Sequence, residues 1–150
     1  MSDFRLLFLQ KALAAAKDAQ HIFPEYAACE AALESRYGES QLARVDNNLF
    51  GMKQHKHHIY GSHALPAREY EDGEWITVRQ EFIKYPGWHE CFQDRMATLI
   101  RLAPVFPAYH AALKTADGES FVTEVSKSWS TDPRAKKVLE IYQRRMRLIR

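Results

Sequence analysis

The chain has 150 residues, of which 46% are hydrophobic, and a formal net charge of +2. This length is usual for one domain with one core, so we expect residues 1–150 to form a single domain that is monomeric. The small charge argues against nucleic acid as a partner, and no apolar run approaches the roughly 20 residues that span a bilayer, so we expect no membrane insertion.

Two helices are predicted at the N-terminus. Asp3 is a suitable cap for the first. The predicted face of this helix consists of Phe4, Leu7, Phe8, Lys11 and Ala15. An apolar patch at residues 6–9 has the character of a signal peptide, but Asp3 before it and Lys11 after it argue against that interpretation, so we expect no export signal. The second helix begins near Pro24 and ends at Gly38.

The middle of the chain contains the one predicted β element. A short turn over residues 40–45 leads to residues 46–48, whose Asp and Asn side chains favour turns. Extended runs at residues 64–70 and 75–84 are joined by Glu71-Asp72-Gly73-Glu74, in which the Asp-Gly pair indicates a hairpin. We therefore predict a two-stranded antiparallel hairpin between helical segments.

The C-terminal half returns to helical spacing. A helix is predicted to follow Gly87 and to end near Pro104. Its stripe consists of Trp88, Cys91, Phe92, Arg95, Met96 and Leu99. Two shorter helices are predicted around residues 108–114 and 120–127, and Ser130-Thr131-Asp132-Pro133 is typical of the start of a last helix.

Neither a metal site nor a cofactor is predicted. Imidazole is a common metal ligand, and one loop contains His55, His57, His58 and His63. Their spacing is irregular, and no nearby cysteine or carboxylate completes a set of four ligands. Cys29 and Cys91 can form at most one disulfide, which a domain of this size does not need, so we expect both to be reduced and packed.

Glu34 is the candidate catalytic acid. A carboxylic acid that stays protonated near neutral pH can donate a proton to a leaving oxygen, for example in a glycosidic bond. Glu34 lies in the last predicted turn of the second helix, where the helix dipole and apolar neighbours are expected to raise its pKa. A glutamate near a helix end is more often a solvated surface residue, so position alone does not assign this role.

Two motifs give the chain a family resemblance. They are Ala32-Leu33-Glu34-Ser35-Arg36-Tyr37-Gly38-Glu39-Ser40 and Asn47-Asn48-Leu49-Phe50-Gly51-Met52-Lys53. In tandem at this spacing they resemble the bacterial glucosaminidase family, which includes the flagellar rod-cap hydrolase domain and several autolysins. The resemblance continues through residues 69–73, residues 82–85 with Trp88, and residues 130–133, so it covers nearly the whole chain.

The resemblance implies a lysozyme-like α+β fold, in which a mainly helical lobe and a small β-hairpin lobe flank a glycan cleft. It implies that Glu34 is the general acid and that Glu69 is a second carboxylate. Glu71 lies on the same strand face and competes for the second role, with Glu69 favoured by the motif. The implied reaction is cofactor-free cleavage of peptidoglycan, between N-acetylglucosamine and N-acetylmuramic acid, by a retaining, inverting or substrate-assisted mechanism.

Several residues are candidate substrate contacts. They are Tyr37, Asn48, Tyr70, Glu71 and Trp129. Asn48 either offers its amide to a sugar or only stabilises a turn, and Tyr70 either lines the cleft or packs in the hairpin. Trp129 stands where the family commonly has a cleft-facing tyrosine, so stacking on a sugar is kept while the phenolic hydroxyl is lost.

Two alternatives to a hydrolase remain open at this point. A lytic transglycosylase of the same fold also uses one glutamate at a helix end but forms an anhydro sugar, and the run at residues 47–51 argues against it. A non-catalytic module would bind peptidoglycan without cutting it. With no export signal, the chain is expected to reach the cell wall as a phage lysin, as a secreted effector, or as an exported enzyme whose leader has been trimmed.

Overall fold

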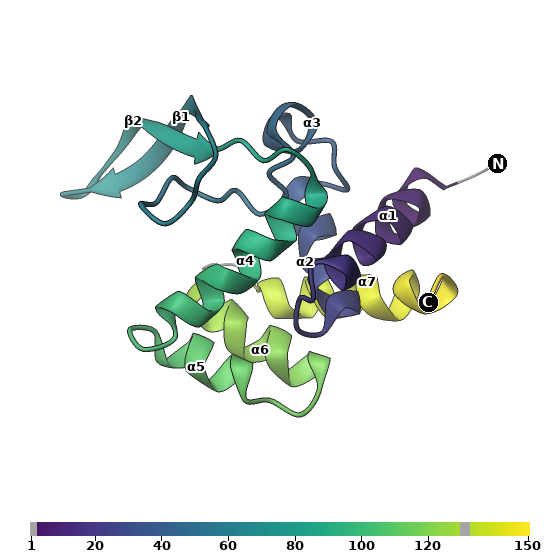
Figure 1. Cartoon of the computed structure of the whole chain (residues 1–150). Coiled ribbons are helices and arrows are strands. Elements are labelled where there is room, and N and C mark those ends of the chain that lie inside the picture. Colours follow the sequence, from purple (N-terminus) through teal and green to yellow (C-terminus); the bar gives the residue numbers. More distant parts are fainter. Residues whose placement is uncertain (1–2, 130–132) are drawn as a thin grey trace.

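The computed structural model describes residues 3–129 and 133–150, and its helices pack into one body from which a β-hairpin projects (Figure 1). In chain order the elements are α1 (Phe4–Asp18), α2 (Pro24–Ser35), α3 (Gln41–Asp46), β1 (Ser62–Glu71), β2 (Glu74–Ile83), α4 (Trp88–Leu102), α5 (Pro107–Leu113), α6 (Gly118–Trp129), α7 (Arg134–Arg144) and a final 3-10 turn (Met146–Leu148). This arrangement confirms the α+β class. Ser130, Thr131 and Asp132, predicted to cap the last helix, lie outside the described residues.

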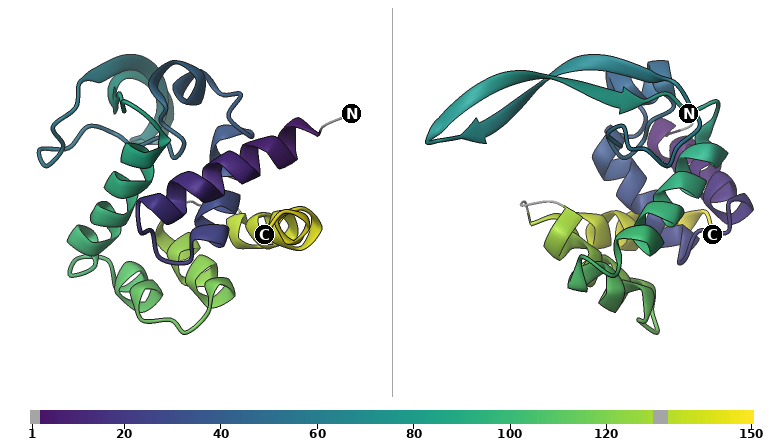
Figure 2. Two further views of the ribbon diagram at one scale, coloured as in Figure 1. Left: turned by 45° about the vertical axis from the view of Figure 1, so that its right-hand side comes forward. Right: turned by 60° about the vertical axis from the view of Figure 1, so that its left-hand side comes forward.

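Helix α1 begins where its cap was predicted, but its buried face differs from the prediction. The Asp3 carboxylate accepts the backbone N–H of Arg5 at 2.9 Å, which satisfies one free donor of the first turn. Leu7 is 53% exposed, whereas the neighbouring Leu9 is fully buried. The buried side is rich in alanine and packs against α2 and α4, because small side chains let the helices approach closely (Figure 2).

Helix α2 runs through the middle of the helical body, and it carries Glu34 in its last turn. It packs against α1, α6 and α7, and four of its alanines are fully buried. After Ser35 the chain turns back sharply, since Arg36, Tyr37 and Gly38 all have positive φ angles. The Ser35 hydroxyl fastens this turn by accepting the backbone N–H of Gly38 at 2.9 Å.

Gly38 should tolerate alanine poorly, because its φ is +82° and a Cβ atom would lie 3.0 Å from the ring of Phe8. Phe8 is buried and packs on Trp88, so it has little room to move. We expect Gly38→Ala to lower the free energy of unfolding by about 2–3 kcal/mol in urea denaturation. Gly73→Ala is the matched control, because φ is +81° there and nothing lies within 4 Å. It should cost only about 1 kcal/mol, and equal losses would contradict the steric explanation.

The turn predicted at residues 40–45 is instead the short helix α3. Ser40 has the extended backbone of an N-cap, and its hydroxyl accepts the N–H of Ala43 at 3.2 Å. The leucine, alanine and arginine that follow favour helix once such a cap is present. Asn47, in the left-handed conformation, ends the helix, as expected of a turn-forming residue.

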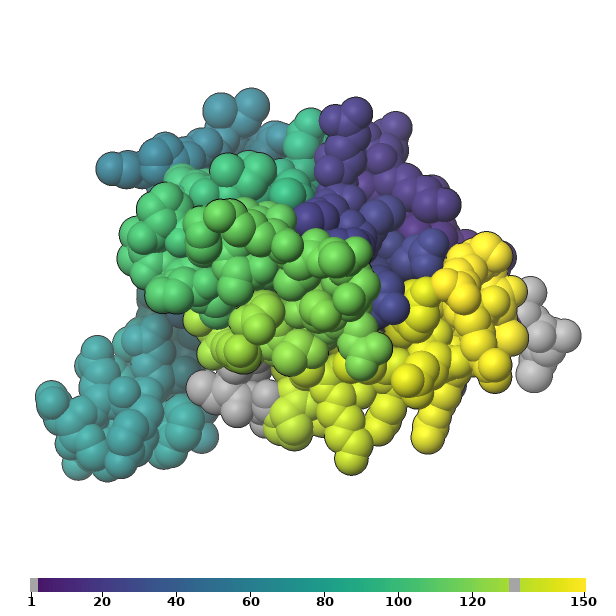
Figure 3. All heavy atoms as spheres, turned by 90° about the horizontal axis from the view of Figure 1, so that it is seen from below, coloured from purple at the N-terminus to yellow at the C-terminus, as the bar shows by residue number. Residues whose placement is uncertain are grey.

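The predicted hairpin is confirmed, and its turn has the expected chemistry. Glu71 pairs with Glu74, so the loop consists of Asp72 and Gly73, whose φ angles of 49° and 81° fit a type I′ turn. The segment after Gly51 adds to the other edge of β2, where Ile83 donates its N–H to the Met52 carbonyl at 3.1 Å. The hairpin is bowed and its free end stands clear of the helices (Figures 2 and 3).

The remaining helices occupy the predicted positions, and both cysteines are free and buried, as expected. Burial raises the pKa of the Cys91 thiol to about 12, so it remains a protonated, packed side chain. Within residues 3–129 and 133–150, no helix has the length and apolar character that crossing a membrane requires.

Candidate active site

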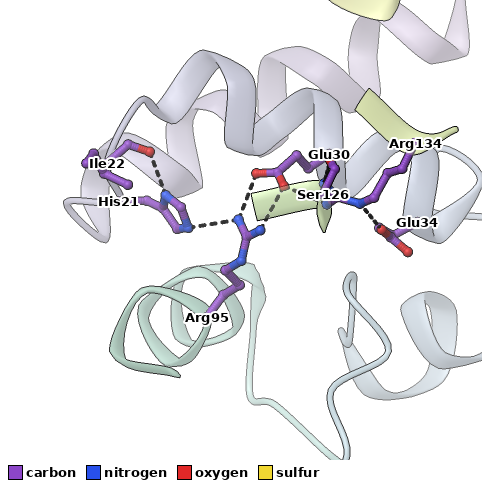
Figure 4. A network of polar contacts seen from close by, with 7 residues as sticks. All are labelled: His21, Ile22, Glu30, Glu34, Arg95, Ser126 and Arg134. Atoms are coloured by element: carbon purple, nitrogen blue, oxygen red, sulfur yellow. Dashed lines mark hydrogen bonds and ion pairs between the residues drawn. The ribbon is translucent and has the colours of Figure 1, made fainter. Parts of the chain in front are cut away.

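Glu34 lies at the end of α2, where an arginine from the last helix binds it. Arg134 donates from Nε to Oε1 of Glu34 at 2.7 Å, although the two residues are 100 positions apart (Figure 4). The Glu34 side chain is 24% exposed, and no described residue binds its other oxygen, Oε2. Packing of α7 against α2 thus brings to this carboxylate a cation that the sequence did not predict.

Arg134 belongs to a buried network of charged side chains. Glu30, one turn before Glu34, is fully buried and accepts two bonds from Arg95, at 2.8 and 2.7 Å. It also accepts one from Nη2 of Arg134 at 2.5 Å, while Nη1 of Arg134 donates to Ser126. Burial acts to raise the pKa of Glu30, but Arg95 and Arg134 outweigh it and hold the pKa at about 2.

This network fixes the orientation of the Glu34 carboxylate. All three donor nitrogens of the Arg134 guanidinium are bound, each to a different side chain, so the group cannot turn without breaking other contacts. Arg134 thus bridges Glu30 and Glu34, while Arg95 binds Glu30. Sequence reasoning missed Glu30, Arg95 and Arg134 as site residues, although an arginine inside the apolar stripe of α4 was a signal of a buried ion pair.

His21 completes the network on the side away from Glu34 (Figure 4). Its Nδ1–H donates to the Ile22 carbonyl at 2.7 Å, and Nε2 accepts from Arg95 at 3.3 Å. Burial and the charge of Arg95 lower the pKa of His21 to about 4. The imidazole is therefore neutral at physiological pH and serves as an acceptor for Arg95.

The depressed pKa of His21 should make the fold sensitive to acid. The unfolded chain binds a proton on this side chain near pH 6.5, whereas the folded protein binds it only near pH 4. Unfolding between these values takes up a proton, so His21 should remove about 3 kcal/mol of stability as the pH falls from 7 to 4. Urea denaturation at several pH values should show a flatter dependence for His21→Gln. The exposed His110→Gln should keep the wild-type slope, and a parallel slope for His21→Gln would exclude this assignment.

Trp129 connects the buried network to an open groove. Its ring lies 4.5 Å from the guanidinium carbon of Arg95, and the ring of Phe50 lies 4.7 Å from the same atom. Trp129 also lines a groove of about 490 Å³ between the segment at residues 51–57 and the end of α4. Its position, half-exposed beside a groove, agrees with a sugar-stacking role.

Glu69 reaches the same groove through an ion pair, whereas Glu71 does not. Lys53, which lines the groove, approaches Glu69 with an Nζ–Oε1 distance of 3.8 Å. Lys53 lies beside Phe82, and Glu69 pairs with Ile76, so a flat strand would separate them by about 20 Å. The bow of the hairpin brings them together. Glu71 shares this strand face but lies exposed beside the turn.

Tyr70 lies on the opposite face of the hairpin from Glu69. It pairs across the strands with Trp75, with ring centroids 5.4 Å apart, and both side chains are 62% exposed. The alternation of side chains along a strand places these two aromatics away from the face of Glu69. The structure therefore places Tyr70 on the face of the hairpin opposite to both Glu69 and Glu71.

Asn48 and Tyr37, two further candidate substrate contacts, interact with other parts of the protein. Asn48 is buried, and its amide donates both hydrogens to backbone carbonyls, those of Met52 and Ile83, each at 3.0 Å. It thus fulfils the turn-stabilising alternative and has no donor left for a sugar. The ring of Tyr37 packs edge-on against Phe8, and the guanidinium of Arg145 lies over it, on the side of α1 and α7.

Two of the four histidines at residues 55–63 bind carboxylates, and the ring centroids of His57 and His58 lie 6.1 and 5.2 Å from that of His55. His55 contacts Asp94 at 3.2 Å, and His63 contacts the buried Asp46 at 2.8 Å. In the part of the chain that the structure describes, no three or more His, Cys, Asp or Glu side chains are arranged to hold a metal ion.

Comparison with known proteins gives consistent matches. The family model described as mannosyl-glycoprotein endo-beta-N-acetylglucosaminidase matches residues 10–147. A probable N-acetylmuramidase of Lactococcus lactis subsp. cremoris is 34% identical over 102 residues, which are 62% of this chain and 22% of the relative. The exo-glucosaminidase LytG of Bacillus subtilis is 35% identical over 83 residues, 54% of this chain and 28% of the relative. The chain thus spans only about a quarter of these relatives.

A solved structure shows the same fold. The catalytic domain of the autolysin Auto from Listeria monocytogenes superposes with a TM-score of 0.83, covering 99% of this chain and 88% of that one, at 24% identity. This likeness confirms the expected lysozyme-like arrangement of a helical lobe and a hairpin lobe. The names of the two sequence relatives refer to different sugars, so they do not assign one bond.

Proposed function

The chain belongs to the glucosaminidase family, and we propose that it is a peptidoglycan hydrolase that cleaves the β-1,4 bond between N-acetylglucosamine and N-acetylmuramic acid. One observation carries the proposal. Glu34 ends a central helix with one carboxylate oxygen anchored by Arg134 and the other unbound by any described residue. A general acid needs this combination of a fixed orientation and a free oxygen.

In this proposal Glu34 donates a proton through Oε2 to the glycosidic oxygen as the bond to the sugar carbon breaks. The carboxylate that forms is stabilised by Arg134, whose contact with Oε1 is already in place. Glu69 is the second carboxylate, which either activates water or stabilises the positive charge on the sugar ring. Its ion pair with Lys53 at the groove supports Glu69 over Glu71. Trp129 stacks on a sugar of the bound strand.

An N-acetylmuramidase, which cuts the other β-1,4 bond of the strand, is the second candidate. The printed name of the Lactococcus relative favours it. Reduction of the digestion products with borohydride separates the two, because it marks the sugar at each new reducing end. We expect mass spectrometry to find reduced N-acetylglucosamine. Reduced muramic acid would establish the muramidase, anhydromuramic acid would establish a lytic transglycosylase, and no products would overturn the proposal.

The proposed place of action is the bacterial cell wall, and the proposed unit is one monomeric domain over residues 1–150. The family and the fold support action on the wall. Sedimentation of the purified chain together with insoluble peptidoglycan tests the partner, and sedimentation velocity tests the monomer.

A further inference from the structure

The groove beside Trp129 is basic and has an apolar floor. Lys53, Lys56 and Arg101 line it together with Met52 and Leu102. No aspartate or glutamate is among the described residues that line it. The volume of about 490 Å³ lies within the range of pockets that hold small ligands.

The positive charge of this groove is largely uncompensated. Within the described part of the chain, Lys53 has Glu69 as its counter-ion at 3.8 Å, and Arg101 donates to the neutral Thr98 alone. Among the described residues Lys56 makes no ion pair. The pKa of His57, which also lines the groove, is lowered by partial desolvation and then by Arg101, Lys56 and His55. Arg101 and Lys56 beside His57 disfavour a further positive charge there, in addition to the desolvation that acts first.

The groove is connected to both candidate catalytic groups through other side chains. Lys53 lines it and binds Glu69. Trp129 lines it and packs on Arg95, which shares Glu30 with the arginine that binds Glu34. A glycan strand lying between Glu34 and Glu69 would therefore carry its side groups past the groove.

We propose that this basic groove binds the carboxylates of the stem peptide that muramic acid carries. The inference rests on the proposed function, because it names a second part of the same substrate. The glycan itself is almost neutral, whereas a stem peptide has several free carboxylates on short aliphatic residues. Lys56 and Arg101 meet the carboxylates, and Met52 and Leu102 contact the aliphatic parts. The groove thus favours muramic acid units that still bear their peptide.

The test compares two substrates prepared from one batch of peptidoglycan stripped of teichoic acid, so that stem peptides supply its carboxylates. One keeps its peptides, and the other has lost them to an amidase, which leaves a single lactyl carboxylate on each muramic acid. We expect the Lys56→Ala/Arg101→Ala variant to lose about tenfold in kcat/KM on the peptide-bearing strands. The loss of kcat/KM on the peptide-free strands should be at least about fivefold smaller. Added salt should weaken the preference of the wild type for peptide-bearing over peptide-free strands. The matched control is Lys17→Ala/Lys136→Ala, which removes two exposed lysines on α1 and α7 and should behave as the wild type on both substrates.

The outcomes separate this inference from the function on which it rests. If the wild type cleaves neither substrate, the proposed function fails. If the wild type cleaves both substrates, two results would overturn the stem-peptide inference alone. The groove variant would lose kcat/KM equally on both substrates, or it would keep the wild-type kcat/KM on both. A binding measurement with the Glu34→Gln protein and soluble peptide-bearing fragments gives a readout independent of turnover. Removing Lys56 and Arg101 should weaken that binding about tenfold, and unchanged binding would overturn the inference.

Discussion

Replacing Glu34 with glutamine is expected to lower kcat for peptidoglycan digestion by about 10³-fold, the contribution typical of a general acid. Glutamine keeps the shape of the side chain and an oxygen that can accept the bond from Arg134, so the turn and the buried network should remain in place. It has no proton acidic enough to donate to a leaving sugar. The rate at which a peptidoglycan suspension clears measures the effect.

Two controls restrict the interpretation of this variant. Glu140→Gln changes an exposed glutamate on α7 and should leave the rate unchanged. Thermal unfolding of Glu34→Gln should show a smaller loss of stability than that of Glu30→Gln, since the Glu34 carboxylate is 24% exposed and Arg134 keeps Glu30 as a counter-ion. Clearing by Glu34→Gln at more than about a tenth of the wild-type rate would remove Glu34 from the role of acid.

Replacing Glu30 with glutamine is expected to lower the free energy of unfolding by about 3–5 kcal/mol. The substitution changes hardly any volume, but it leaves Arg95 and Arg134 buried with one carboxylate fewer. Glu30 and Arg95 are fully buried and Arg134 is nearly so, so water cannot replace the lost charge. Urea denaturation at pH 7, above the pKa values of both Glu30 and His21, measures the loss without interference from their titration.

A double-mutant cycle tests whether the loss of stability comes from the ion pair between Glu30 and Arg95 and not from either side chain alone. Arg95→Met removes one buried cation while keeping the apolar stem between Phe50 and Trp129. Combined with Glu30→Gln it should cost less than the sum of the two single losses, because the second change removes a charge that the first left unpaired. Additive losses would contradict the network.

The order of the elements could be predicted from local signals. Asp3 and Pro24 mark helix starts, and the Asp72-Gly73 pair allows the two positive φ angles of a hairpin turn. These signals act within a few residues, and the sequence displays them directly. The hairpin and the helices on either side of it were expected for this reason.

The faces of the elements were harder to predict. The stripe expected on α1 included Leu7, yet contact with α2 and α4 selects the alanine-rich side. In the hairpin, Glu69 and Tyr70 are neighbours in sequence but point to opposite faces. A motif therefore does not define a site, because tertiary packing decides which of its residues meet.

The charge network was beyond the sequence argument because its members come from α2, α4 and α7. Arg134 meets Glu34 only because two helices pack side by side, and no local pattern joins positions 34 and 134. The ion pair of Glu34 was accordingly missed, while the position of Glu34 at the end of its helix was correctly predicted. Burial of Arg95 in an apolar stripe was the clue available beforehand.

The most direct measurement is digestion of purified peptidoglycan in water enriched in ¹⁸O by the wild type and by Glu34→Gln, followed by mass spectrometry of the fragments. A hydrolase with Glu34 as its acid should release fragments that carry one ¹⁸O atom at a reducing N-acetylglucosamine. The Glu34→Gln protein should release almost none. Unlabelled anhydro fragments from the wild type, or equal release of labelled fragments by both proteins, would contradict this mechanism.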